Sequence, residues 1–123
     1  MDILNGIPQI PVDDIPHDAV LLDVRERVEF IAGHAPGAIN VPMSELQARL
    51  VEVPRGEDAL LVICRSGVRS QKVAEFLATR DVPAINVLGG TVAWQQTGHP
   101  LVSDNDEEPA VVAPPTSPPP TGP

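Results

Sequence analysis

The sequence predicts an α/β fold in which a mostly parallel sheet carries helices on both faces, and two observations predict it. Short apolar runs alternate with segments of helical spacing, as successive βα units require. Several of the runs are continuously apolar instead of alternating, which is typical of parallel strands covered on both sides. A chain of 123 residues has room for one ordinary domain of this kind.

The expected strands are five in number, at residues 9–12, 19–24, 38–41, 59–63 and 84–88. The helical segments between and after them are expected at residues 26–32, 44–53, 70–80 and 91–97. In the second of these segments Ser44 is a favourable N-cap, and it is followed on one helical face by Leu46, Leu50 and Val53. Because helices connect the strands, we expect those strands to run parallel.

The composition changes after Val102. Residues 103–123 contain seven prolines and four acidic residues, and no lysine, arginine or aromatic residue. Such a segment buries too little apolar surface to offset the entropy lost on ordering. We therefore expect a folded domain at residues 1–102 and an acidic, proline-rich disordered tail at 103–123.

Charge and cysteine content narrow the class of protein. A formal net charge of −9 argues against nucleic acid or an anionic membrane as partners. The single cysteine rules out an internal disulfide framework and fits a reducing compartment. No signal peptide is visible at the N-terminus, and prolines and glycines interrupt the uncharged stretch at 82–103. We expect a cytoplasmic protein that needs no metal or other cofactor, since three dispersed histidines and one cysteine share no ligand spacing.

The first candidate for chemistry is that single cysteine, Cys64. An apolar run ends at Cys64, a short polar loop follows, and a helical pattern begins directly afterwards. Unpaired amides at a helix N-terminus and the guanidinium groups of Arg65 and Arg69 favour a thiolate over a thiol. A lone cysteine after a strand is often an inert core residue. Ser66 and Gly67, together with the two arginines, are poor core material, so we interpret Cys64 as a nucleophile.

A second segment of interest follows the expected strand at 19–24. Ligands of open α/β sheets bind beyond the carboxyl ends of the strands, where Cys64 and residues 23–26 both lie. We expect Asp23 and Arg25 to brace the site through an ion pair and capping contacts instead of reacting. Together with the inward-pointing amides of the loop that ends at Ser70, these features predict an anion site with a nucleophile on its floor.

Four motifs resemble those of single-domain rhodaneses, in the order and spacing of that family. They are Leu-Asp-Val-Arg-Glu at 22–26, Gly-His-Ala-Pro-Gly-Ala-Ile-Asn-Val-Pro at 33–42, Cys-Arg-Ser-Gly-Val-Arg-Ser at 64–70 and Gly-Gly-Thr-Val-Ala-Trp at 89–94. The resemblance covers about residues 9–102 and implies a five-stranded parallel sheet between helices. It also implies thiosulfate sulfurtransferase activity and a persulfide on Cys64. The backbone amides that would cradle the persulfide belong to Arg65, Ser66, Gly67, Val68 and Arg69.

The chemistry implied by this resemblance has two half-reactions. The Cys64 thiolate attacks the outer sulfur of thiosulfate, expels sulfite and becomes a persulfide. An acceptor such as cyanide or a thiol then removes the sulfur, so we expect ping-pong kinetics. The expected partners are a small anionic sulfur donor and one of these acceptors.

Three alternatives are weighed against this interpretation. Cysteine phosphatases of related fold place an arginine at the sixth position after the cysteine, where this chain has Ser70, with Arg69 one residue earlier. The shorter loop favours a sulfur atom over a phosphoryl group. A catalytically silent interaction module needs neither Cys64 nor the arginines. A persulfide carrier that delivers sulfur to a protein partner stays open, because the same loop serves both functions.

Overall fold

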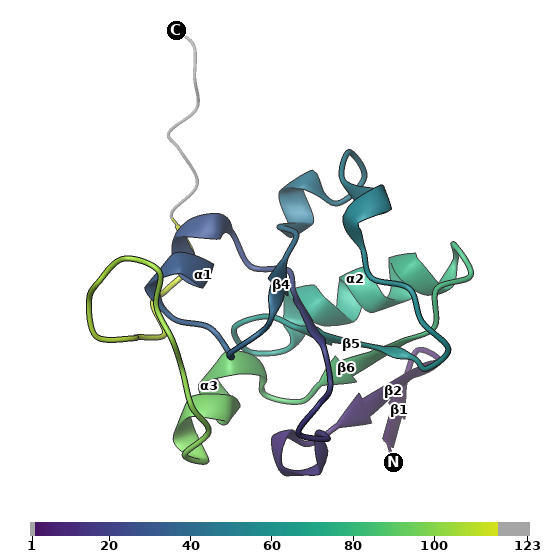
Figure 1. Ribbon diagram of the computed structural model, residues 1–123. Coiled ribbons are helices and arrows are strands. Elements are labelled where there is room, and N and C mark those ends of the chain that lie inside the picture. Colours follow the sequence, from purple (N-terminus) through teal and green to yellow (C-terminus); the bar gives the residue numbers. More distant parts are fainter. Residues whose placement is uncertain (1, 116–123) are drawn as a thin grey trace, which may run out of the picture.

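The computed structural model describes residues 2–115 of the chain. Its strands form one sheet in the order β1-β2-β6-β5-β3-β4, with β1 antiparallel to β2 and the remaining neighbours parallel (Figure 1). The strands are β1 (Asp2–Leu4), β2 (Ile7–Ile10), β3 (Leu21–Asp23), β4 (Ile39–Asn40), β5 (Leu60–Ile63) and β6 (Ala84–Val87). The predicted α/β class is confirmed, and the five expected strands correspond to β2 through β6.

The additional strand, β1, was not predicted. A turn at Asn5 and Gly6, with φ of 50° and 79°, folds β1 back onto β2. All three residues of β1 are exposed, so no buried apolar pattern marks the strand in the sequence. The described residues therefore form a six-stranded sheet, one strand more than expected.

Three of the four expected helices are present. They are α1 (Arg27–Ala32), α2 (Val68–Ala78) and α3 (Gly90–Gln96). In α3 the indole Nε1 of Trp94 donates to the carbonyl of Pro100 at 2.7 Å, which ties the helix to the chain that follows it. Among the described residues, no helix is both long and apolar enough to cross a bilayer.

The prediction of a helix at 44–53 is wrong. This segment forms two separate 3-10 turns, Met43–Glu45 and Leu50–Glu52. The backbone of Arg49 between them has φ −113° and ψ 23°, outside the helical range, so a continuous helix cannot pass through it. Leu46 is nevertheless buried, because the apolar spacing reflects side chains that reach the core and not one continuous helix.

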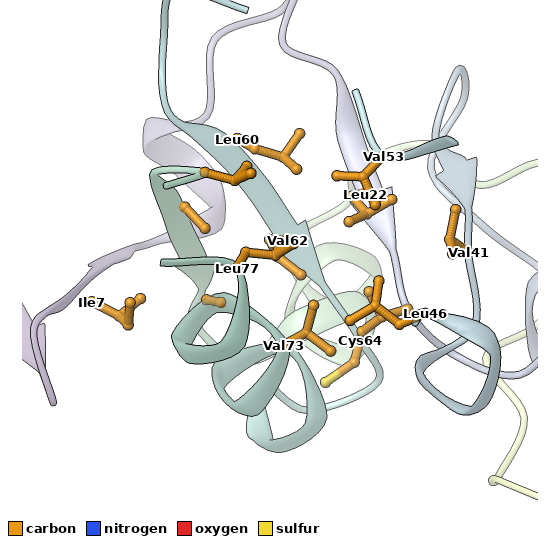
Figure 2. Packing of buried hydrophobic residues seen from close by; sticks show 14 residues of the cluster. Ile7, Leu22, Val41, Leu46, Val53, Leu60, Val62, Cys64, Val73 and Leu77 are labelled. Atoms are coloured by element: carbon orange, nitrogen blue, oxygen red, sulfur yellow. The ribbon is translucent and has the colours of Figure 1, made fainter. Parts of the chain in front are cut away.

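Apolar side chains pack on both faces of the sheet because successive residues of a strand point to opposite sides. On one face Leu22 and Val62 from the strands meet Val73 and Leu77 of α2, and Cys64 belongs to the same cluster (Figure 2). On the other face the cluster lies against α3 and includes Ile10, Leu21, Leu61, Ile63 and Val87. The helices α2 and α3 thus cover opposite faces, as expected.

Residues 103–115, the described part of the predicted tail, lie against α1. The backbone amides of Asp104 and Ala110 donate to carbonyls at the C-terminal end of α1, each at 2.9 Å. Gly33 permits this contact, because a Cβ there would lie only 2.8 Å from the amide nitrogen of Ala110. Residues 116–123, the remainder of the predicted tail, lie outside the described residues.

Candidate active site

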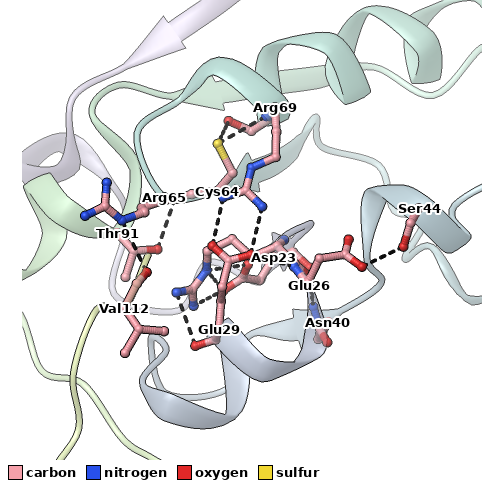
Figure 3. Close-up of polar contacts among 12 residues, drawn as sticks. Asp23, Glu26, Glu29, Asn40, Ser44, Cys64, Arg65, Arg69, Thr91 and Val112 are labelled. Carbon is pink, nitrogen blue, oxygen red and sulfur yellow. Dashed lines mark hydrogen bonds and ion pairs between the residues drawn. The ribbon is translucent and has the colours of Figure 1, made fainter. Parts of the chain in front are cut away.

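Cys64 lies at the carboxyl end of β5, in the loop that leads into α2. Its side chain is 1% exposed, and its Sγ points to the N-terminus of that helix. The backbone amides of Gly67 and Ser70 donate to Sγ at 3.1 and 3.3 Å, and the Ser70 hydroxyl oxygen lies 3.2 Å from it. Figure 3 shows Cys64 next to Arg69 of α2. Gly67 adopts φ 101°, in the left-handed region that favours glycine, and this turns its amide toward the sulfur.

The first turn of α3 donates hydrogen bonds to the backbone of the loop. The carbonyl of Cys64 accepts hydrogen bonds from the Thr91 amide at 2.8 Å and the Thr91 hydroxyl at 3.1 Å. The carbonyl of Arg65 accepts one from the Val92 amide at 3.0 Å. Gly90 has φ 58°, and a Cβ at that position would lie 2.6 Å from the carbonyl carbon of Arg65. The N-terminus of α3 reaches the loop only because residue 90 has no side chain.

Arg69 is engaged by Glu29 of α1. Its two terminal nitrogens each donate to a different carboxylate oxygen of Glu29 at 2.8 Å. Burial raises the pKa of Glu29, but hydrogen bonds from Arg69 and from the Glu26 backbone, with the nearby guanidinium charges, outweigh it and lower the pKa below its ordinary value. The same hydrogen bonds, donated to the Glu29 carboxylate, raise the pKa of Arg69. The arginine therefore contributes positive charge near Cys64 while its donors are directed to α1.

Asp23 and Arg25 form a buried ion pair at the end of β3. The Nη2 of Arg25 lies 2.7 Å from an Asp23 carboxylate oxygen, and both side chains are nearly free of solvent exposure. Arg25 also donates to the carbonyl of Gly33 at 2.8 Å. Through its bonds to the carbonyls of Glu29 and Gly33, Arg25 ties the pair to α1 and the chain after it. Neither residue bonds to the sulfur among the described contacts.

Arg65 lies at the rim of the site, where the C-terminal segment crosses it. Its Nε donates to the carbonyl of Val112 at 3.2 Å. Its remaining guanidinium donors make no other hydrogen bond among the described residues, so they stand available to an anion. The backbone amides of Ser66, in the loop, and Val68, the first residue of α2, make no hydrogen bond to the sulfur among the described contacts, so their role in binding sulfur stays a prediction.

An open groove adjoins the site on the α2 side. It has a volume of about 450 Å³, and Leu46 and Val73, which pack in the same cluster as Cys64, are among its lining residues. Lys72 and Phe76 of α2 also line it, together with Met43. The groove therefore has a mixed apolar and polar lining that includes the cation of Lys72, and it lies beside the cluster that contains Cys64.

Three buried residues around the site, Asn86, Gln9 and Glu29, were not identified from the sequence. Asn86 of β6 lies 2.5 Å from the Ser70 hydroxyl through its Oδ1, and its Nδ2 donates to Gln9 of β2 at 2.8 Å. A polar residue within an otherwise buried strand is the signal that marks both. Glu29, the partner of Arg69, gave no such signal, because a glutamate in a short helix is ordinarily exposed.

Comparison with known proteins covers the segment that carries Cys64 and its loop. The family model described as a Rhodanese-like domain matches residues 11–97. The chain belongs to the rhodanese family. A sulfurtransferase of Allochromatium vinosum is 33% identical to it over 87 residues, which cover 70% of this chain and 80% of that protein. The suspected resemblance is thereby confirmed, and the family is one of sulfurtransferases.

Two further rhodanese relatives add to this picture. A rhodanese-related protein of Thermoplasma volcanium has a crystal structure that matches with a TM-score of 0.71 at 35% identity, covering 77% of this chain and 97% of that one. A putative sulfur carrier protein of Bacillus subtilis is 31% identical over 97 residues, which cover 73% of this chain and 52% of that protein. The chain thus has the rhodanese fold and belongs to a family of sulfurtransferases.

Proposed function

We propose that this rhodanese takes sulfane sulfur from thiosulfate onto Cys64 and passes it to a thiol or to cyanide. One observation carries the proposal: the Cys64 sulfur accepts hydrogen bonds from two backbone amides at the N-terminus of α2. Amides in this position stabilise negative charge on sulfur through their hydrogen bonds and the helix dipole. A stabilised thiolate is both the attacking group in the first step and the leaving group in the second.

The reaction balances without an oxidant or a reductant. In the first step the Cys64 thiolate forms a bond to the outer sulfur of thiosulfate, the sulfur–sulfur bond of thiosulfate breaks, and sulfite leaves with the electron pair. The acceptor thiolate or cyanide then attacks the terminal sulfur, and Cys64 leaves as a thiolate. No metal or cofactor enters either step.

The substrate-binding groups follow from the geometry of the loop. The amides of Arg65, Ser66, Gly67, Val68 and Arg69 would surround the outer sulfur. Because the first turn of a helix lacks partners for its amides, those of Val68 and Arg69 are free to donate to it. The guanidinium group of Arg65 would hold the sulfonate oxygens at the rim.

Intact-mass spectrometry tests this proposal. Protein treated with thiosulfate and freed of excess donor should gain the mass of one sulfur atom, and the Cys64→Ser variant should gain none. Cyanide added afterwards should remove the gain and release thiocyanate in equal amount. Wild-type protein that takes up no sulfur from thiosulfate or from any added persulfide donor would contradict the proposal.

A second candidate is a persulfide carrier whose acceptor is another protein, which the sulfur carrier relative favours. The groove beside α2 offers a mixed apolar and polar surface that such an acceptor would contact. The two functions differ in the preferred acceptor: a loaded carrier would pass its sulfur to its protein partner faster than to small thiols, whereas the enzyme would turn over small thiols or cyanide efficiently. The proposal includes a cytoplasmic setting, supported by the single cysteine and the lability of persulfides under oxidation.

A further inference from the structure

A chain of buried polar side chains leads away from the catalytic sulfur. It begins at Ser70, continues through Asn86 and Gln9, and reaches Gln71 on α2. All four residues are less than 9% exposed. Because every buried polar atom in such a chain needs a partner, the direction in which each group donates is constrained.

Asn86 has only one possible orientation. Its Nδ2 lies 3.2 Å from the carbonyl oxygen of Gly67, and a carbonyl accepts hydrogen bonds but cannot donate. The amide nitrogen must therefore point that way, and its second hydrogen goes to the Gln9 Oε1 at 2.8 Å. The Oδ1 of Asn86 is left facing the Ser70 hydroxyl.

The far end of the chain agrees with this direction. The Gln9 Nε2 donates to the carbonyl of Ile7 at 2.9 Å and to the Oε1 of Gln71 at 2.7 Å. The Gln71 Nε2 in turn donates to the carbonyl of Leu4 at 3.0 Å. Acceptor-only carbonyl groups thus fix the orientation of all three amides.

The Ser70 hydroxyl has one hydrogen and two neighbours that could take it. The Asn86 Oδ1 lies 2.5 Å from the hydroxyl oxygen, and it is the side chain's remaining acceptor. The Cys64 sulfur lies farther away, at 3.2 Å. Since the hydrogen goes to Asn86, the Ser70 oxygen presents a lone pair to the sulfur.

We propose that Asn86 is a positioning residue that holds the Ser70 hydroxyl hydrogen away from Cys64, so that the hydroxyl withholds a hydrogen bond from the thiolate. To donate to the thiolate, the hydroxyl must turn from Asn86 to the sulfur. That turn leaves the buried Asn86 oxygen without a donor, which is costly. Asn86 and Ser70 therefore oppose the stabilisation that the loop amides give to the thiolate.

The hydrogen-bond arrangement at Asn86 does not depend on the proposed function, whereas its effect on turnover rests on it. Both half-reactions use the Cys64 thiolate, as the attacking group and then as the leaving group. By withholding the Ser70 hydroxyl from the thiolate, Asn86 would slow both half-reactions. It would protect the sulfur from unwanted alkylation and oxidation at the expense of turnover.

The rate of Cys64 alkylation by iodoacetamide, followed across pH together with the ultraviolet absorbance of the thiolate, tests the inference without any sulfur donor. Ser70→Ala removes the lone pair and keeps the backbone amide, so alkylation at neutral pH should be about fivefold faster. Asn86→Ala frees the hydroxyl to donate to the sulfur, so alkylation should again be faster by a similar factor. In both variants the pH profile should move to lower pH.

The double variant separates positioning from general loosening of the fold. Once Ser70 is alanine, Asn86→Ala should change the alkylation rate no further, because its effect passes through the hydroxyl. Slower alkylation in Ser70→Ala would overturn the inference, since it would show that the hydroxyl donates to the thiolate. This sign is decisive even if the Asn86 variants fail to fold.

The charged groups that meet the site are the same in all these variants. They are Arg65 and Arg69 from the loop and α2, and Glu29 with Glu26 from α1. A change in the pH profile therefore reports on the hydroxyl and not on these charges. Failure of wild-type protein to load sulfur would contradict the proposed function, while the order of alkylation rates would still test the role of Asn86.

Discussion

At the scale of single residues, Asp23 and Arg25 form a buried ion pair in which each charge depends on the other for compensation. Neither side chain is more than 1% exposed, and among residues 2–115 the guanidinium group forms an ion pair only with Asp23. A buried ion pair adds little net stability, but removing one partner leaves an uncompensated charge in the interior. We infer that the intact pair is needed for α1 and the chain after it to fold beside the site.

We therefore expect Asp23→Ala to lower the free energy of unfolding by about 3–5 kcal/mol, measured by urea denaturation. Glu45→Ala is the matched control, because Glu45 also pairs with an arginine, Arg49, but on the surface. The control should change the stability far less, since water screens an exposed pair. Equal losses in the two variants would show that burial of Asp23 does not govern its role.

At the scale of secondary-structure elements, the close contact between α3 and the loop that carries Cys64 fixes the position of that loop. The Thr91 amide and hydroxyl bind the carbonyl of Cys64, and the backbone of Gly90 touches that of Arg65. The position of the sulfur thus depends on a second helix as well as on α2.

Gly90→Ala should impair both folding and sulfur loading, because its Cβ would collide with the loop backbone. Gly98→Ala is the matched control, since Gly98 also has a positive φ, 82°, but open space around it. The control should cost about 1–2 kcal/mol for the backbone conformation and load sulfur normally. Intact mass after thiosulfate treatment measures loading, and normal loading in Gly90→Ala would contradict this account.

At the scale of the whole molecule, the ion pair between Glu29 and Arg69 joins α1 to α2 and makes stability depend on pH. The pKa of Glu29 is lower in the folded protein than its ordinary value of 4.5. Its contribution to stability is therefore complete above that ordinary value and is lost as the pH falls through the lowered one.

Urea denaturation at a series of pH values checks this linkage. Wild-type protein should be more stable than Glu29→Gln at neutral pH, and the difference should shrink as the pH falls below the ordinary range of glutamate. A difference that stays constant with pH would assign the effect of the substitution to packing.

Most of the sheet and the position of Cys64 at the end of a strand could be predicted because they depend on local patterns. Continuous apolar runs marked the parallel strands, and the polar loop after one of them marked Cys64. β1 could not be predicted, because its pairing with β2 leaves no buried pattern. The partners of Arg69 and Ser70 are likewise set by tertiary contacts, since Glu29 lies 40 residues from the first and Asn86 lies 16 from the second.

The hydrogen bond from Trp94 to Pro100 has a practical consequence. The chain contains one tryptophan and no tyrosine, so its near-ultraviolet emission comes essentially from this one indole. Trp94 lies on α3, one helical turn from Thr91. Thr91 donates a hydrogen bond to the carbonyl of Cys64, so the indole is close to the loop that carries this cysteine. Its fluorescence therefore reports local unfolding of α3 and the Cys64 loop. Comparison with circular dichroism, which follows the whole backbone, would reveal whether this region unfolds before the rest of the protein.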